Sequence, residues 1–150
     1  MLLFLLVGAV VNPKFIAKAV LSTHSDAIIA SDSEGIIRFW NPGAERIFGY
    51  AADEAMGQSL NLIIPERLRQ RHWDAFRQTM QTGHSRYGEA DVLSGPALRK
   101  DSTPLSVEFT IQPLRDDSGV MTGMVAILRD VTQRFEEMRE LKRNVAGARK

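Results

Sequence analysis

The stretch DSEGIIRFWNPGAERIFGY, residues 32–50, contains the signals that decide the fold. Residues 32–35 have the composition of a tight turn, in which Gly35 can adopt a positive φ. The apolar segments on either side, 27–30 and 36–40, each have the length and composition of a strand. Two such segments joined by a short turn predict a β-hairpin.

Helices follow this hairpin. Asn41 is a favoured N-cap and Pro42 a favoured first helical residue, so a short helix is predicted over 42–48, ending at Gly49. The same start and stop signals predict a helical turn that opens at residues 53–54 and stops at Gly57. They also predict a longer helix that begins at Pro65 and ends at Gly83. Residues 132–146 have high helix propensity and alternating charge, which favours a C-terminal helix.

Strands dominate the second half of the chain before that last helix. Residues 86–93 and 103–114 are predicted strands, and 95–97 (Gly-Pro-Ala) a loop between them. Within 103–114, apolar and polar residues alternate, as expected for a strand with one buried face: Leu105, Val107, Phe109 and Ile111 against Ser106, Glu108, Thr110 and Gln112. Residues 121–128 are apolar on both faces, which predicts a central strand. The resulting order, β-β-α-α-α-β-β-β-α, indicates an α+β fold with an antiparallel sheet.

Composition limits the function. A chain of 150 residues with 44% hydrophobic and 25% charged residues is typical of one globular domain. The net charge of +1 argues against direct nucleic-acid binding, which normally uses a basic surface. The sequence has no cysteine, which excludes disulfides, cysteine nucleophiles, Cys-ligated metal centres and a cysteinyl flavin adduct. It also fits a reducing compartment, so we expect a cytoplasmic protein.

The first eleven residues, MLLFLLVGAVV, are uncharged. They are too few to span a bilayer, for which about 20 apolar residues are needed, and no positive residue precedes them as in a signal peptide. Three interpretations remain: the end of a membrane helix, a helix packed on the domain or a second chain, and a vestigial start. Packing is favoured, and a membrane-attached sensor is the alternative. Phe15, Ile16, Ala19 and Val20 have helical spacing and predict a short lead-in helix.

Several motifs along this order resemble the PAS domain family, in particular the S-box type of bacterial sensors. The matching segments are DSEGII (32–37), WNPGAERIFGY (40–50), EAMGQ (54–58), IIPE (63–66), RKDS (99–102) and RDVT (129–132). Ser102 departs from the family, which often has glycine there. The resemblance implies a five-stranded antiparallel sheet with short helices on one face, flanked by N- and C-terminal helices. It predicts a lead-in segment over 1–21, a PAS domain over 22–131 and a signalling helix over 132–150.

The resemblance also implies a sensory function in bacterial signal transduction, in a two-component system or in transcription regulation. PAS domains sense a small molecule, light, redox state or a partner protein, and they relay the signal through flanking helices. Asp130 and Thr132 match the junction between sheet and signalling helix, and either side chain would also cap that helix. Apolar residues at both ends of the chain predict a homodimer.

The sequence contains none of the catalytic or nucleotide-binding motifs GxxxxGK[ST], GxGxxG and HExxH. Its histidines are His24, His72 and His84, so the C-terminal helix has no phospho-accepting histidine. We therefore expect no enzymatic activity, and an effector on another chain or on residues outside this sequence. A ligand-free interaction module is an alternative function.

His72 is the candidate cofactor ligand. Leu68, His72, Phe76 and Met80 recur every four residues and share one helix face, which places an imidazole in an apolar stripe. Residues 64–72 resemble the corresponding helix of bacterial haem oxygen sensors with PAS domains, in which the matching histidine binds iron. A haem b sensor with His72 as proximal ligand is therefore an alternative function.

Against this assignment, histidine at this position also occurs in PAS domains without haem. In addition, residues 88–92, GEADV, lack the arginine that one group of haem sensors has on the next strand. Acidic Glu89 and Asp91 would fit poorly near a haem pocket. Large side chains predicted to face the pocket either line a cavity or fill it: Ile28, Trp40, Phe76, Met80, Val107, Phe109 and Ile127.

Overall fold

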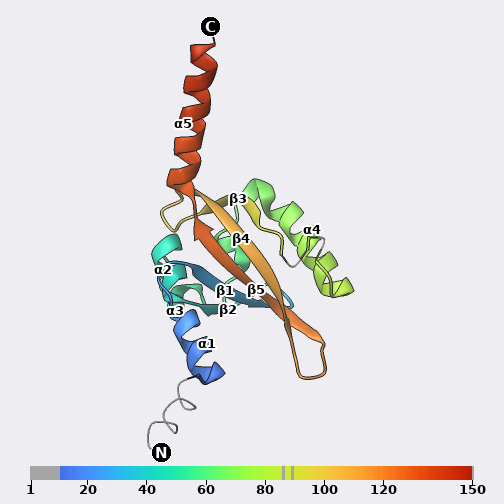
Figure 1. The fold of residues 1–150 in the computed structure, drawn as a ribbon. Coiled ribbons are helices and arrows are strands. Elements are labelled where there is room, and N and C mark those ends of the chain that lie inside the picture. Colours follow the sequence, from blue (N-terminus) through green and yellow to red (C-terminus); the bar gives the residue numbers. More distant parts are fainter. Residues whose placement is uncertain (1–10, 86, 89, 150) are drawn as a thin grey trace, which may run out of the picture.

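The chain folds into one antiparallel sheet with helices on its concave face and a further helix at each end (Figure 1). A computed structural model describes residues 11–85, 87–88 and 90–149. Its elements are α1 (Pro13–Leu21), β1 (Ala27–Asp32), β2 (Ile37–Trp40), α2 (Pro42–Phe48), α3 (Ala52–Ala55), the 3₁₀ turn η1 (Leu60–Leu62), α4 (Glu66–Thr82), β3 (Leu93–Leu98), β4 (Pro104–Arg115), β5 (Met121–Asp130) and α5 (Thr132–Ala148). The predicted fold class and element order are confirmed, and η1 is an addition to them.

The order of strands across the sheet is β2-β1-β5-β4-β3. β5 lies in the middle and pairs with β1 on one side and β4 on the other, as its two apolar faces predicted. The first hairpin is also confirmed, because β1 and β2 pair antiparallel through Ile29–Trp40 and Ala30–Phe39.

β3 was assigned wrongly from the sequence. The strand runs from Leu93 to Leu98 and contains Gly95 and Pro96, which were predicted to form a loop, whereas the predicted strand 86–93 contributes only Leu93. (Residues 86 and 89 lie outside the described part.) Proline is tolerated in an edge strand, where its missing N–H need not join a ladder. β3 is such an edge strand and pairs only with β4.

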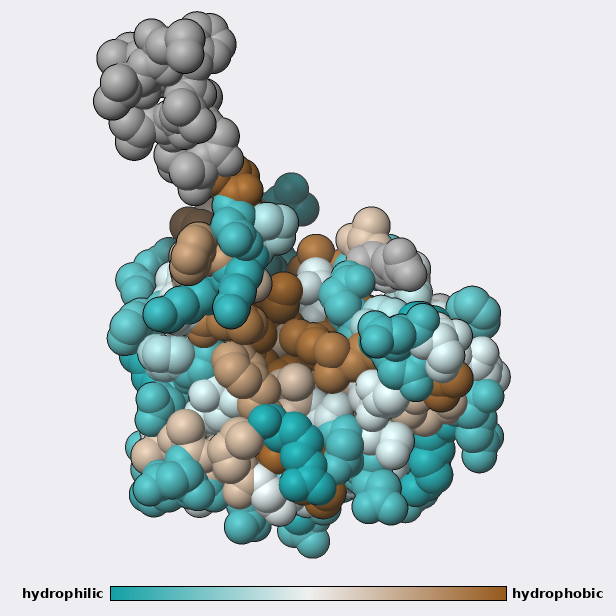
Figure 2. All heavy atoms as spheres, turned by 90° about the horizontal axis from the view of Figure 1, so that it is seen from below, coloured by the Kyte–Doolittle hydropathy of each residue, from teal (hydrophilic) through white to brown (hydrophobic). Residues whose placement is uncertain are grey.

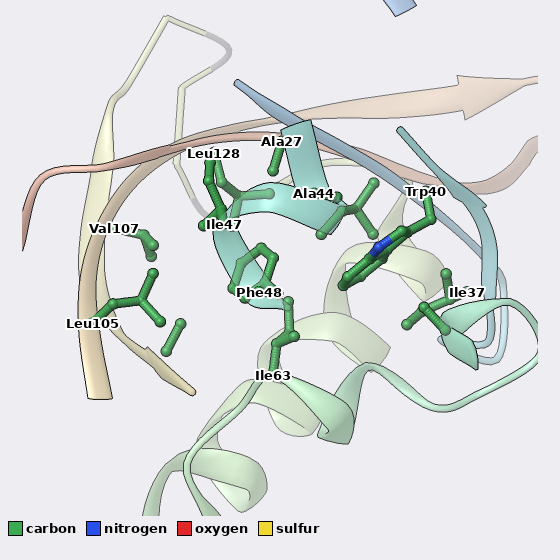
Figure 3. Close-up of a cluster of buried hydrophobic side chains, with 13 residues drawn as sticks. Ala27, Ile37, Trp40, Ala44, Ile47, Phe48, Ile63, Leu105, Val107 and Leu128 are labelled. Atoms are coloured by element: carbon green, nitrogen blue, oxygen red, sulfur yellow. The ribbon is translucent and has the colours of Figure 1, made fainter. Parts of the chain in front are cut away.

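The core lies between α2 and the concave face of the sheet. Figure 3 shows Ile47 and Phe48 of α2 among side chains of β4 and β5, with Ile63 beneath Phe48. Ala44, Ile47 and Phe48 are at most 2% exposed. Side chains of α2 therefore occupy this half of the domain.

Asn41 connects this core to the segment before β1. Its side chain is 1% exposed and caps α2, as predicted, by accepting a hydrogen bond from the Ala44 N–H at 2.9 Å. The same oxygen accepts from the Ile28 N–H at 2.8 Å. Its amide nitrogen donates to the carbonyl oxygens of Thr23 and Asp26, both at 3.0 Å. One side chain thus fixes the path of the chain from α1 into β1.

The two terminal helices extend away from the sheet (Figure 1). Neither α1 nor α5 has a buried residue, and the apolar side chains Phe15 and Val20 of α1 and Met138 and Leu141 of α5 are all at least half exposed. The apolar start of the chain lies outside the described residues, apart from Val11. Within the described residues, no helix is long and apolar enough to cross a bilayer.

Candidate functional site

An apolar cavity of about 440 Å³ lies between α4 and the concave face of the sheet. Ligand pockets in proteins usually measure roughly 300–1,000 Å³ and are lined mainly by apolar side chains with a few polar groups. Helix α4 contributes Leu68, Arg71, His72, Ala75 and Phe76, and the sheet contributes chiefly Ile29, Ser31, Leu93, Ala97, Val107, Phe109, Ile111, Met124, Ala126 and Leu128. In a space-filling view from below, hydrophobic side chains gather in a hollow between more hydrophilic regions (Figure 2).

Three of the seven predicted pocket residues, Phe76, Val107 and Phe109, line this cavity, and His72 lines it as well. Ile28 and Ile127 do not. They pair with each other across β1 and β5, next to the lining pair Ile29 and Ala126. Because alternate residues of a strand point to opposite faces, Ile28 and Ile127 are directed away from the cavity. Both strands are apolar on both faces, so the sequence alone did not reveal this.

Trp40 and Met80 are also absent from the cavity wall. Trp40 belongs to the filled core, where its ring centroid lies 5.6 Å from that of Phe48 and its Nε1 donates to the Tyr50 carbonyl at 3.0 Å. Met80 lies three steps of four residues beyond Leu68. Each residue turns a helix by about 100°, so twelve residues turn it by roughly 120° more than three full turns. Met80 therefore points about 120° away from Leu68 around the helix axis, off the face that lines the cavity.

His72 presents an uncharged imidazole to the cavity. Its ring packs against Trp73 and Phe76, with centroid distances of 4.8 and 6.0 Å. Its Nδ1 is buried and has no hydrogen-bond partner within the described residues. Burial lowers the pKa of His72 from 6.5 to about 4, so the ring is neutral at pH 7. A neutral imidazole is the form that ligates a metal.

These properties fit an axial haem ligand in part. The cavity is apolar and large, and the imidazole on its wall is unprotonated. A metal-bound histidine usually donates its other N–H to an acceptor, and Nδ1 has no such acceptor among the described residues. Asp91, which was expected to disfavour haem, is exposed and accepts a hydrogen bond from the Gly88 N–H at 2.8 Å. The described residues contain no cluster of three or more metal-ligating side chains.

The junction between the sheet and α5 is built on Asp130 and Thr132. One oxygen of Asp130 accepts from the Thr132 N–H at 3.0 Å and from the Thr132 hydroxyl at 2.5 Å. Its other oxygen accepts from Arg99 Nη2 at 2.7 Å. Burial opposes ionisation of Asp130, but the hydrogen bonds from Thr132 and Arg99 outweigh it and lower the pKa of this carboxyl group. Asp130 is therefore charged at pH 7.

Arg99 and Ser106 extend this junction to other elements. Arg99 also donates through Nε to the Ile47 carbonyl of α2 at 3.2 Å. The Ser106 carbonyl of β4 accepts from the Val131 N–H at 2.9 Å, and its N–H donates to the Thr132 hydroxyl at 3.0 Å. The contact of Arg99 with Asp130 was missed in the sequence, although RKDS was among the matching segments, because the two residues lie 31 positions apart.

The chain is thus an α+β domain with an antiparallel sheet, a cavity under one long helix and a further helix that follows the last strand. A family model described as PAS fold matches residues 17–131, and the chain belongs to this family. It is similar to the sensor protein FixL of Bradyrhizobium diazoefficiens, with 30% identity over 127 residues, which is 83% of this chain and 24% of that protein. It also resembles the oxygen sensor protein DosP of Escherichia coli, with 24% identity over 106 residues, which is 71% of this chain and 13% of that protein.

Among solved structures, the PAS domain of a protein from Colwellia psychrerythraea is similar, with a TM-score of 0.69 and 26% identity. The match covers 81% of this chain and 98% of that one. The chain spans less than a quarter of the length of FixL and of DosP. The chain is thus a PAS sensory domain, a type of domain that occurs in larger sensor proteins.

Proposed function

We propose that this domain binds a small, largely apolar molecule in the cavity under α4 and relays its presence through the Asp130 junction to α5. The cavity is the observation that carries the proposal, since it is large and apolar while the α2 half of the domain is filled. We also propose that the domain itself has no catalytic activity. Its effector would then lie beyond α5 or on another chain.

The connection from cavity to junction is short. Leu128 lines the cavity and precedes Asp130 by two residues, as Ala97 precedes Arg99. Val107, also on the wall, pairs with Asp130 in the β4–β5 ladder. On each of the strands β3, β4 and β5, therefore, a residue of the cavity wall lies close to the junction. It either precedes a junction residue by two positions or pairs with one. A ligand that shifts these strands would shift the first turn of α5.

We further propose that the terminal helices mediate homodimerisation. Val131, Met138 and Val145 occupy one heptad position and Leu141 and Ala148 the other, and Met138, Leu141 and Val145 are all at least half exposed. This is the spacing of the apolar positions by which two helices pair in a coiled coil, here over two heptads. Light scattering over a range of concentrations tests this proposal, and a monomer at every concentration would contradict it.

Binding of 1-decanol, measured by titration calorimetry, tests the cavity. Ala126 lines the cavity, so Ala126→Phe should fill it and abolish binding. Val125→Phe changes the neighbouring residue on the opposite face of β5 and should leave binding unchanged. Equal binding by the wild type and both variants would contradict the proposed site.

Haem b is a second candidate, favoured by the neutral imidazole of His72 on the cavity wall. His72 would supply the axial ligand, and Phe76, Phe109 and Ile111 the apolar surface against the macrocycle. Haem held there would supply an iron centre that can bind a diatomic gas. An absorption spectrum of protein from haem-supplemented cells should then show a Soret band that His72→Ala removes and that His24→Ala, at an exposed histidine outside both cavity walls, keeps. A flat visible spectrum of the folded wild type would exclude haem.

A further inference from the structure

A second, smaller cavity continues the first toward the turn between β4 and β5. It has a volume of about 170 Å³ and shares Tyr87, Ile111 and Met124 with the wall of the larger one. Its own wall includes His84 and Arg115, so it is more polar. Two adjoining spaces that share three side chains can hold the two ends of one molecule.

Arg115 belongs to the same row of side chains as the apolar wall. Val107, Phe109 and Ile111 line the larger cavity, and the next alternate residues of β4, Pro113 and Arg115, line the smaller one. Alternate residues share a face of a strand, and the rise is about 3.4 Å per residue. The backbone of Arg115 therefore lies roughly 14 Å beyond that of Ile111 along one surface.

The guanidinium group of Arg115 is held in place at this end. Its Nη2 donates to the Gly83 carbonyl at the end of α4 at 2.8 Å, and its Nη1 to the Gly119 carbonyl at 3.2 Å. Arginine has five N–H donors, so these two bonds leave donors that can reach a ligand. Asp116, the next residue in the chain, is engaged by Ser118 and by the Val120 N–H.

The described residues that line the two cavities include Arg71, His72, His84 and Arg115 but no aspartate or glutamate. An anion at the polar end would meet a fixed cation without an opposing carboxylate on the described wall. Arginine binds carboxylates well because its planar fork matches the two oxygens. A ligand without a negative charge would leave this end of the site unused.

We infer that the two cavities form one amphipathic site, which takes a ligand with an apolar body under α4 and a carboxylate head at Arg115. This inference rests on the proposed function and adds the chemical class of the ligand. A fatty carboxylate and the carboxylates of a haem macrocycle share this chemistry. Only haem would need His72, so His72→Ala distinguishes the two sources.

Calorimetric titrations with decanoate and with 1-decanol, which differ only in the head group, test the inference. A charge-assisted hydrogen bond contributes about 1.5–3 kcal/mol, so the wild type should bind decanoate roughly 10- to 150-fold more tightly than decanol. Arg115→Gln should bring the two affinities within about twofold by weakening decanoate alone. Arg77 is an exposed arginine of α4 that pairs with Asp74, so Arg77→Gln is the matched control. This variant should keep the preference for decanoate over decanol.

Equal affinities for the two ligands in the wild type, or an intact preference in Arg115→Gln, would overturn the inference. If circular dichroism shows that Arg115→Gln does not fold, Arg115→Lys replaces it. This variant keeps the charge but loses the planar fork, so the preference should fall, and an unchanged preference would again overturn the inference. Failure of both ligands to bind contradicts the proposed cavity function itself, whereas decanol binding without a preference contradicts only the assignment of the head group.

Discussion

Replacing Asn41 with alanine should remove a large part of the stability of the domain. Its buried side chain makes four hydrogen bonds, to Ile28, Ala44, Thr23 and Asp26. At about 1 kcal/mol net for each bond, the loss amounts to roughly 4 kcal/mol. The Ile28 N–H, left buried without an acceptor, adds about 1–3 kcal/mol to this. Domains typically have only 5–15 kcal/mol of stability in total, so the variant should be close to unfolding.

Urea unfolding followed by circular dichroism measures this loss. Asn41→Asp keeps the acceptor oxygen but turns a second oxygen toward the carbonyl oxygens of Thr23 and Asp26 in a buried site, so it should lose at least as much stability as Asn41→Ala. Asn12→Ala is the control, because Asn12 caps the exposed helix α1 through one hydrogen bond to the Lys14 N–H. Asn12→Ala should lower the free energy of unfolding by about 1 kcal/mol or less. A similar small loss for Asn41→Ala would refute the view that this side chain organises the start of the sheet.

Three further predictions concern stability. Because burial holds the pKa of His72 near 4, the unfolded chain takes up a proton below pH 6.5 that the folded chain does not. The free energy of unfolding should therefore fall by about 2 kcal/mol between pH 7.5 and pH 5, and less in His72→Phe. A Cβ at Gly43 would overlap the Asp26 carbonyl, so Gly43→Ala should lower the urea midpoint, whereas Gly147→Ala in open space should not. Ser102 has a φ of 68°, which is strained for a residue with a Cβ, so Ser102→Gly should raise the melting temperature of the domain. An unchanged or lower melting temperature would contradict this.

Local signals in the sequence were sufficient for much of the fold. The turn at 32–35, the N-cap Asn41 and the apolar β5 each specify an element through neighbouring residues, and the structure confirms all three. β3 could not be found in this way. Gly95 and Pro96 favour a loop in isolation, and only the position of the strand at the edge of the sheet makes them acceptable.

The candidate site was less predictable, because it depends on contacts between distant residues. His72, Val107 and Phe109 follow clear periodic patterns and do line the cavity. Ile28 was misplaced because an apolar strand does not show which face meets the helices. The contact between Arg99 and Asp130 joins the residue after β3 to the end of β5, which is not a neighbour of β3 in the sheet, and no local pattern marks it.

The coupling of the cavity to α5 is tested most directly by amide hydrogen exchange, measured by NMR on the whole chain with and without 1-decanol. The amides of Ser106 and Val131 both bond across the junction. The account predicts that filling the cavity changes their exchange rates in the wild type but not in Asp130→Ala. The amide of Met56, which bonds to the Ala52 carbonyl at the end of α3 and lies outside both cavity walls, should be unaffected. Changes confined to residues of the cavity wall, with Ser106 and Val131 unaltered in decanol-bound wild type, would contradict the proposed relay.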